Sequence, residues 1–493
     1  MRIKINENQL MSNKSSLKSK ATKGMFWSAT DKIASEAGQF VIGIVLARLL
    51  MPKDFGLIGM LSIFIAISQS FIDSGMGSGL IQKKNKKDID FSTVFIFNFA
   101  VSILFYLILF ITAPFIAGFY DMPQLVLLTR VLSINIIINS LAIVQRSKLT
   151  IDIDFKTIAK VNVSSVVLSG LIAMFLAYTG WGVWALVIQR LVASVVSVIM
   201  LWMLSKWKFS ILFSKQSFKE LFGFGSKLLI SGLYAQTLNN IYNIVIGKAY
   251  SASDLGFYTR AKSFAMITSG TVTSILHQVT YPILASLQDD RERMVSVYSR
   301  LIKMTTFFVF PAMTLLSLLA EPLVILLLTE KWIPVIILLQ WMSFARIFYP
   351  ISVINMNILN AIGRSDLFLK VDLSKFPIAV MALVITIPLG VKAMVIGHVV
   401  TSVISIFINA YLPGKLFGYG AISQLKDMAP VFFATGIMAL TVYFTNLFIE
   451  VQWLKLIIGS CIGLITYLMV CYTLKLDELT EVKSLLLKFS GKR

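Results

Sequence analysis

Long apolar stretches, separated by short polar ones, recur along the whole chain. Each stretch is close to or above the ~20 residues that a helix needs to cross a bilayer. Helices are predicted rather than strands, because an open sheet would leave backbone N–H and C=O groups unpaired in lipid. The pattern predicts an all-α polytopic membrane protein of about 14 transmembrane helices, at residues 26–50, 55–80, 91–119, 123–145, 157–178, 181–205, 221–250, 254–287, 297–320, 333–362, 366–389, 391–413, 428–449 and 452–474.

The first twelve predicted helices form two similar halves. Ile44–Arg48 precedes the triplet Asp54-Phe55-Gly56, and Ile244–Lys248 precedes the triplet Asp254-Leu255-Gly256, an offset of 200 positions. Six helices per half is an even number, so both halves enter the membrane in the same orientation, as two lobes related by an axis along the membrane normal. Two further pairs of segments repeat with an offset of 208, namely 113–116 with 321–324 and 182–185 with 390–393.

This repeat divides the chain into two six-helix lobes and four additional parts, one of which holds two extra helices. The last two helices have no counterpart in the repeat, and a basic segment separates the two lobes. The predicted parts are a basic tail at 1–25, the N-lobe at 26–205, a cytoplasmic linker at 206–220, the C-lobe at 221–413, helices 13 and 14 within 414–475, and a C-terminal tail at 476–493.

Composition supports a membrane protein and excludes several other classes. Hydrophobic residues make up 57% of the chain and charged residues only 14%, too few to cover a soluble surface of this size. Lys and Arg number 45 against 24 Asp and Glu. This excess has the sign expected for nucleic-acid binding, but long apolar runs do not fit that function, and no nucleic-acid partner is expected.

The basic residues also predict an orientation. Lys and Arg concentrate in every second loop and in the helix ends beside it, whereas the intervening loops hold few of them. Because cytoplasmic loops carry an excess of positive charge, both termini of this multi-pass protein are predicted to be cytoplasmic.

Polar side chains inside the predicted spans are candidates for a cavity, since charge facing lipid is costly. In the first span, Lys32, Glu36 and Gln39 lie on one side at helical spacing. The same Lys32–Glu36 pair, at positions i and i+4, would also serve as a buried structural pair. In the seventh span, Gln236, Asn239 and Asn243 share a face.

Amides both donate and accept hydrogen bonds, which suits sugar hydroxyls, and hydrogen bonding between helices is an equal alternative for these three residues. Arg190 and Arg346 fall near mid-span, and Arg130 in the outer third of its span. Arginine matches phosphate by bidentate bonding, and the spans contain few acids to neutralise these guanidinium groups. Lys227, near an inner end, is a further substrate-binding candidate, and snorkelling to the interface is its alternative role.

Signatures of enzymes and metal sites are missing from the sequence. It contains two cysteines and two histidines, too few for a zinc cluster or a histidine-rich metal site. It has no GxxxxGK[ST] phosphate-binding loop and no long loop that would house a glycosyl-transfer site. The chain is therefore predicted to be no enzyme and to need no cofactor or metal.

Several segments resemble a known transporter family. These are Lys23–Ser28, Leu46–Gly56, Asp73-Ser74-Gly75 with Leu80–Lys84, and Ile246–Lys248 with Leu255–Ala261. They resemble the polysaccharide transporter branch of the MOP flippase superfamily, and in particular the Wzx-type exporters of lipopolysaccharide, O-antigen and colanic-acid units.

The resemblance implies a MATE-like or MOP-like fold and a function. By this resemblance the protein would move an undecaprenyl-diphosphate-linked oligosaccharide of O-antigen, capsule or exopolysaccharide across the bacterial cytoplasmic membrane by alternating access. It implies coupling to an H+ or Na+ gradient or to the membrane potential, with membrane lipids and other polysaccharide-assembly proteins as candidate partners.

Three alternatives follow from the same features. A multidrug exporter of the MATE type would need an acidic cavity for organic cations, and the excess of Arg and Lys speaks against it. A polymerase or ligase would need a large outer loop, which the sequence lacks. A flippase for the peptidoglycan precursor uses the same lipid carrier and stays open.

Overall fold

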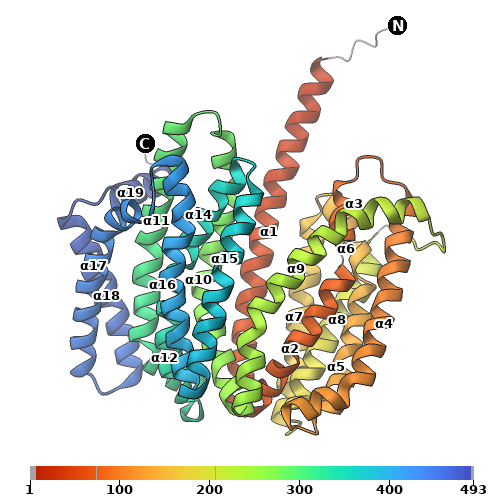
Figure 1. The fold of residues 1–493 in the computed structure, drawn as a ribbon, viewed down its shortest axis with the longest axis horizontal. Coiled ribbons are helices and arrows are strands. Elements are labelled where there is room, and N and C mark those ends of the chain that lie inside the picture. The colour runs from red at the N-terminus through yellow and green to blue at the C-terminus, as the bar shows by residue number, and fades with distance from the viewer. Residues whose placement is uncertain (1–6, 74, 206, 490–493) are drawn as a thin grey trace. The chain divides into compact units, whose positions relative to one another are not determined.

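The computed structural model describes the backbone of residues 7–73, 75–205 and 207–489, and every regular element in these ranges is a helix (Figure 1). Within these ranges, the structure does not describe the side chains of residues 7–22, 25, 227, 231, 271–272, 274–279, 281–282, 365 and 485–489. By contacts the chain separates into two units, residues 1–256 and 257–493. The predicted lobe boundaries remain predictions.

The first unit holds the helices that build the candidate site. Helices α7 and α8 pack on each other, α1 packs on α7, and α2 lies between α5 and α9. The helices are α1 Glu7–Leu49, α2 Pro52–Asp73, α3 Met76–Gln82, α4 Asp88–Tyr120, α5 Leu125–Ser140, α6 Ile143–Ile151, α7 Phe155–Tyr178, α8 Val183–Leu204 and α9 Lys215–Ala249, followed by the first residues of α10 Ala252–Ser286.

The second unit is also built from packed helices. Helix α16 packs against α13, α14 and α15, and α17 packs against α11 and α18. After α10 the helices are α11 Arg291–Leu318, α12 Ala320–Leu328, α13 Pro334–Ile347, α14 Tyr349–Ala361, α15 Ser365–Thr386, α16 Val391–Phe417, α17 Ala421–Leu447, α18 Gln452–Thr473 and α19 Asp477–Phe489, with short 3-10 turns at Glu330–Trp332 and Ile387–Leu389.

The chain is an all-α multi-pass membrane protein. Ten segments of the described chain are long and apolar enough to cross a membrane, and they correspond to α2–α3, α4, α5–α6, α7, α8, α11, α13–α14, α16, α17 and α18. The other four predicted spans coincide with α1, α9, α10 and α15, which carry more polar residues. The count of fourteen therefore remains a prediction, while the helical membrane fold is confirmed.

Some predicted spans are interrupted helices. The predicted helix at 55–80 ends at Asp73 and resumes at Met76, because Gly75 adopts a left-handed conformation with φ of 65°. The predicted helix at 333–362 divides into α13 and α14, and Pro350 lies in the first turn of α14, where its missing N–H costs no helical hydrogen bond.

The two copies of the repeated triplet have the same local structure, and the glycine of each copy lies against the first residue of the helix that carries the other copy. Asp54 accepts a hydrogen bond from the Met51 N–H at 2.9 Å, and Asp254 accepts one from the Ser251 N–H at 3.2 Å, so each aspartate caps the start of its helix. A Cβ placed on Gly56 would lie 1.6 Å from the Ala252 carbonyl oxygen. The corresponding Cβ on Gly256 would lie 2.0 Å from the carbonyl oxygen of Pro52, the first residue of α2. The contact is therefore reciprocal.

A buried carboxylate ties the start of α4 to α3 and α9. Lys83 Nζ donates to Asp90 Oδ1 at 3.0 Å and to Glu220 Oε2 at 2.9 Å, and the Lys87 N–H donates to Asp90 Oδ2 at 2.9 Å. Asp90 is 1% exposed. Burial alone would lower the pKa of Lys83, but its hydrogen bonds to Glu220 and Asp90 outweigh burial and raise that pKa. This contribution to stability is complete below the usual lysine pKa and is lost only as the pH rises above it.

Lys83→Met is therefore expected to destabilise the first unit. Methionine keeps the apolar stem of the side chain but leaves the Asp90 carboxylate without its cation, at a cost of about 1–3 kcal/mol. Thermal unfolding of the purified protein in detergent at neutral pH measures the effect as a lower Tm. The matched control is Lys84→Met, because Lys84 is exposed and forms no ion pair with a described residue. Equal Tm values for the two variants would contradict this role of Lys83.

The second unit contains a closed ring of buried hydrogen bonds. The Tyr298 hydroxyl donates to Asn355 Oδ1, Asn355 Nδ2 donates to Gln424 Oε1 at 3.1 Å, and Gln424 Nε2 donates back to the Tyr298 hydroxyl at 3.0 Å. The three residues belong to α11, α14 and α17. A network in which each side chain satisfies the next fixes the relative positions of these helices.

Candidate functional site

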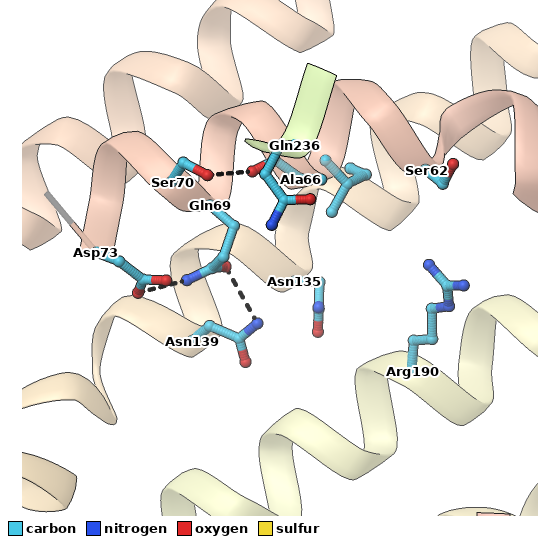
Figure 2. A pocket seen from close by; sticks show the side chains of 10 residues that line it. Ser62, Ala66, Gln69, Ser70, Asp73, Asn135, Asn139, Arg190 and Gln236 are labelled. Carbon is cyan, nitrogen blue, oxygen red and sulfur yellow. Dashed lines mark hydrogen bonds between the residues drawn. The ribbon is translucent and has the colours of Figure 1, made fainter. Parts of the chain in front are cut away.

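The first unit contains a polar, partly open cavity of about 330 Å³. This volume falls at the lower end of the range of small-ligand sites in proteins. Figure 2 shows side chains from four helices directed into the same space. The lining residues are Ser62, Ile65, Ala66, Gln69, Ser70 and Asp73 from α2, Asn135 and Asn139 from α5, Arg190 from α8, and Gln236 from α9.

One side of the cavity is a linked set of an acid and two amides. Gln69 Nε2 donates to Asp73 Oδ1 at 3.0 Å, and Asn139 Nδ2 donates to Gln69 Oε1 at 3.4 Å (Figure 2). Asp73 also interacts electrostatically with Arg146 of α6. Arg146 therefore offsets only part of the charge of Asp73, and the two hydrogen bonds hold Gln69 in one orientation.

Arg190 enters the cavity from the opposite side. Its guanidinium points from α8 toward α2 near Ser62 (Figure 2), and it forms no ion pair or hydrogen bond with any described residue. Asn135 Oδ1 is buried in the same cavity without a hydrogen-bond partner among the described residues. A cation and an open acceptor thus face one space, and a buried polar group without a partner is costly unless a ligand satisfies it.

Only some of the amides predicted on the seventh span reach this cavity. Gln236 lines it. Asn243 donates to Ser62 Oγ at 3.1 Å and to Asn240 Oδ1 at 3.2 Å, so it joins α9 to α2. Asn239 is exposed and lies outside the lining. Each of the two roles predicted for this amide face is therefore filled by one residue. Gln236 lines the cavity, and Asn243 forms a hydrogen bond between helices.

The predicted polar stripe of the first span lies apart from the lining of this cavity. Lys32 Nζ and Glu36 Oε1 are 3.9 Å apart, and both side chains are about 40% exposed. Gln39 is exposed as well. Lys32 and Glu36 are an i,i+4 ion pair, as the spacing predicts. Their role in substrate binding remains a prediction.

A different acid of α1, Asp31, is hydrogen-bonded to a neighbouring helix. Asn162 Nδ2 of α7 donates to Asp31 Oδ2 at 2.8 Å, and the Arg146 guanidinium donates to Asn162 Oδ1 at 3.1 Å. Arg146 interacts electrostatically with both Asp31 and Asp73. This arginine therefore connects the α1 acid with the acid in the cavity.

Two further predicted site residues have other surroundings. Arg130 Nε donates to the Phe110 carbonyl at 3.3 Å, and its guanidinium carbon lies 4.3 Å from the centre of the Phe110 ring. It does not line the cavity. The side chain of Lys227 lies outside the described residues.

Arg346 belongs to a separate cationic group in the second unit. Its guanidinium carbon lies 5.2 Å from the centre of the Tyr349 ring. Lys262 of α10 and His398 of α16 are close enough to Arg346 to interact with it electrostatically. The positive charges of Arg346 and Lys262 repel one another, so an anion placed between them would be stabilised.

The sequence contains a signal for the cavity residues that were missed. Gln69 with Asp73 and Asn135 with Asn139 are pairs four residues apart, and each pair lies on one helix face within an apolar run. The same four-residue spacing predicts the ion pair between Lys32 and Glu36. The pairs identify polar helix faces but not which helices face one another.

The comparisons identify the family. A family model described as polysaccharide biosynthesis protein matches residues 45–337, more than half of the chain. The chain belongs to this family. The match includes α2, α5, α8 and α9, the helices that line the cavity, and it confirms the resemblance to polysaccharide transporters drawn from the sequence.

Three curated relatives of this family member have names that describe polysaccharide assembly. Teichuronic acid biosynthesis protein TuaB of Bacillus subtilis is 25% identical over 78% of this chain and 80% of its own length. Succinoglycan biosynthesis transport protein ExoT of Rhizobium meliloti is 27% identical, covering 63% of each chain. Lipopolysaccharide biosynthesis protein WzxC of Escherichia coli is 22% identical over 80% of this chain and 81% of its own length.

Solved structures show the same fold at low sequence identity. The lipid II flippase MurJ in an inward closed conformation superposes with a TM-score of 0.71 and 16% identity, covering 92% of this chain and 98% of MurJ. An inward-facing MATE family multidrug transporter of the MOP superfamily superposes with a TM-score of 0.62 and 17% identity, covering 78% of this chain and 95% of that one. The MATE-like and MOP-like fold expected from the resemblance is confirmed.

Proposed function

We propose that this protein is a flippase for an undecaprenyl-diphosphate-linked oligosaccharide, a repeat unit of a surface polysaccharide. The observation that carries the proposal is the polar cavity around Arg190 within the apolar helices of a chain from the polysaccharide biosynthesis family. The names of TuaB, ExoT and WzxC support the same class of cargo. The protein acts by transport and is no enzyme.

The cavity chemistry suits a sugar. Gln69, Asn135, Asn139 and Gln236 offer amide donors and acceptors, and Ser62 adds a hydroxyl. Sugar hydroxyls need both kinds of partner, and amides supply both from one side chain. The volume of about 330 Å³ has room for a part of an oligosaccharide, with the remainder outside this cavity.

The cations suit the diphosphate of the carrier. Arg190 stands without an ion-pair partner among the described side chains, and Arg346 lies in a second group of cations. A guanidinium binds phosphate oxygens through two parallel hydrogen bonds. We assign Arg190 and Arg346 to the diphosphate, and we keep Lys32, Glu36, Gln39, Lys227, Asn239 and Asn243 as weaker candidates for substrate binding. Arg130 contacts Phe110 and does not line the cavity, so we assign it no part in binding.

The proposed mechanism is alternating access in the bacterial cytoplasmic membrane, with both termini on the cytoplasmic side. A two-lobe transporter exposes its polar site to one leaflet and then to the other. The proposed energy source is an H+ or Na+ gradient or the membrane potential, as the resemblance to the family implies. The sequence contains no GxxxxGK[ST] phosphate-binding loop, which is consistent with this proposal. Membrane lipids and other polysaccharide-assembly proteins are the further proposed partners.

The experiment in cells uses a strain that lacks this gene and carries a labelled undecaprenyl carrier pool. We expect lipid-linked repeat units to accumulate with their glycan on the cytoplasmic side, and restoring the gene should release them to the outer side. An unchanged pool with normal surface polysaccharide would contradict the proposal. Accumulation of lipid II instead would favour the peptidoglycan-precursor alternative.

A second candidate function is export of organic cations, since a MATE transporter shares the fold. Asp73 is the acid in the cavity that such a cation would need. This acid already interacts with Gln69 and Arg146, while Arg190 repels a cation in the same space. Drug susceptibility of the deletion strain distinguishes the two functions, and we expect it to match the parent strain.

A further inference from the structure

An apolar groove with one cation in its lining runs between α15 and α16 in the second unit. Its volume is about 490 Å³. Val371 of α15 and Phe407, Tyr411 and Leu412 of α16 supply apolar walls, and Phe407 and Tyr411 are 49% and 66% exposed. Lys370 is the charged residue of this lining.

The charge of Lys370 is not used within the described part of the protein. Asp366 lies one turn before Lys370, at the spacing of a helical ion pair. It is bound instead by Arg364, whose Nε and terminal nitrogen donate to its two carboxylate oxygens at 2.8 and 2.9 Å. The next acid of the helix, Asp372, pairs with Lys375 at 2.6 Å. Lys370 is thus a surplus cation that is exposed beside an apolar groove.

The position of Lys370 along the helix fits the headgroup layer. Helix α15 begins at Ser365, so Lys370 lies about 8 Å along its axis at 1.5 Å per residue. On α15 the lining runs from Leu367 to Ser374, so the groove extends about one turn beyond Lys370 toward the middle of the helix. A basic side chain near the end of a helix, followed by an apolar cleft, has the polarity of a membrane lipid, with its charge at one end and its chain along the helix.

We propose that this groove binds a resident anionic phospholipid. The phosphodiester lies against the Lys370 ammonium, and an acyl chain lies along Val371, Phe407 and Tyr411. One lysine matches the single negative charge of a phosphodiester, whereas a diphosphate carries more charge and suits several cations better. This proposal does not depend on what the protein transports.

The chain offers a natural control in a second groove. Leu318 of α11 and residues of α17 that include Phe433, Leu440 and Tyr443 form an apolar groove of about 560 Å³, whose lining contains no charged residue. An acyl chain entering this groove meets no cation. The occupancy of this second groove is therefore expected to be independent of the charge of the lipid headgroup.

The test uses the full-length protein in phosphatidylcholine nanodiscs, with a trace of photoactivatable lipid that carries a diazirine on its acyl chain. The lipid is either phosphatidylglycerol or phosphatidylcholine, and mass spectrometry maps the crosslinked peptides. We expect peptides containing 367–374 and 407–412 to be labelled about fivefold more by phosphatidylglycerol, the preference that one basic residue gives near an anionic lipid. Peptides of the α11–α17 groove should be labelled equally by both lipids.

Three variants make the test specific. Lys370→Gln should abolish the preference for phosphatidylglycerol in the α15–α16 groove. Lys426→Gln should retain it, because Lys426 is also an exposed lysine at the sixth position of its helix but does not line the groove. Ser374→Phe, which fills the groove, should reduce labelling there by both lipids and leave the α11–α17 groove unchanged.

The proposal fails on any of three results. The first is equal labelling of the α15–α16 groove by both lipids. The second is a preference for phosphatidylglycerol that persists in Lys370→Gln. The third is displacement of the labelled phosphatidylglycerol by undecaprenyl phosphate but not by an equal amount of unlabelled phosphatidylglycerol. The last result would assign the groove to the carrier lipid. A failure of transport in cells has no bearing on these outcomes, so the two proposals are tested separately.

Discussion

Gly56→Ala is expected to prevent the protein from accumulating in a folded state. The added methyl group would lie 1.6 Å from the Ala252 carbonyl oxygen and 2.5 Å from its carbon, and both are backbone atoms that cannot rotate away. The starts of α2 and α10 would have to separate, at a cost of at least ~3 kcal/mol. Fluorescence-detected size-exclusion chromatography of a tagged protein measures the loss as a reduced or aggregated peak.

The same result is expected for Gly256→Ala, because the contact is reciprocal. Its methyl group would lie 2.0 Å from the Pro52 carbonyl oxygen. The control is Gly223→Ala in α9, where a Cβ meets nothing within 4 Å. There alanine is expected to be neutral or stabilising by about 0.5–1 kcal/mol, since glycine in a helix is entropically unfavourable. A Gly56→Ala variant with the yield and Tm of Gly223→Ala would show that this contact is not needed.

Arg190→Gln is expected to reduce transport by about 10- to 100-fold while the protein still folds. Its guanidinium faces the cavity without an ion pair to a described residue, so its removal leaves no protein charge unpaired. Loss of a charge-assisted hydrogen bond to the substrate costs about 1.5–3 kcal/mol, which corresponds to this range. Transport is measured as restoration of surface polysaccharide in the deletion strain, at protein levels matched by immunoblot.

Two companion variants define the role of Arg190. Arg190→Lys keeps the charge but loses bidentate binding, so partial activity is expected. Arg130→Gln is the matched control, because Arg130 contacts Phe110 and does not line the cavity. It should transport at a level near that of the wild type. Full activity of Arg190→Gln, or equal loss in Arg130→Gln, would refute the assignment.

The sequence predicted the elements of the fold better than their contacts. Apolar runs of sufficient length predicted a helical membrane protein, because length and hydropathy alone decide whether a segment can span a bilayer. The repeated triplets at Asp54–Gly56 and Asp254–Gly256 were recognisable as a repeat. That the two copies pack against each other could not be predicted, since the contact depends on how helices distant in the chain are arranged.

The candidate site was predicted only in part for the same reason. Arg190 and Gln236 were selected as polar residues within spans, and they line one cavity. Gln69 and Asn139 were missed because an amide becomes a site residue only when its partner on another helix is known. The interruption at Gly75 also escaped prediction, because a left-handed glycine leaves no mark in hydropathy.

The most direct test of the proposed function is transport by the purified protein in liposomes. Liposomes containing undecaprenyl-diphosphate-linked oligosaccharide are prepared with the wild-type protein, with Arg190→Gln, or without protein, and an external glycosidase reports the sugar that reaches the outer leaflet. An applied H+ or Na+ gradient or membrane potential tests the coupling. We expect the wild-type protein to expose the inner pool much faster than protein-free liposomes, and Arg190→Gln to remain close to them. If the wild-type protein is no faster than protein-free liposomes under any gradient, the protein is not a flippase for this substrate.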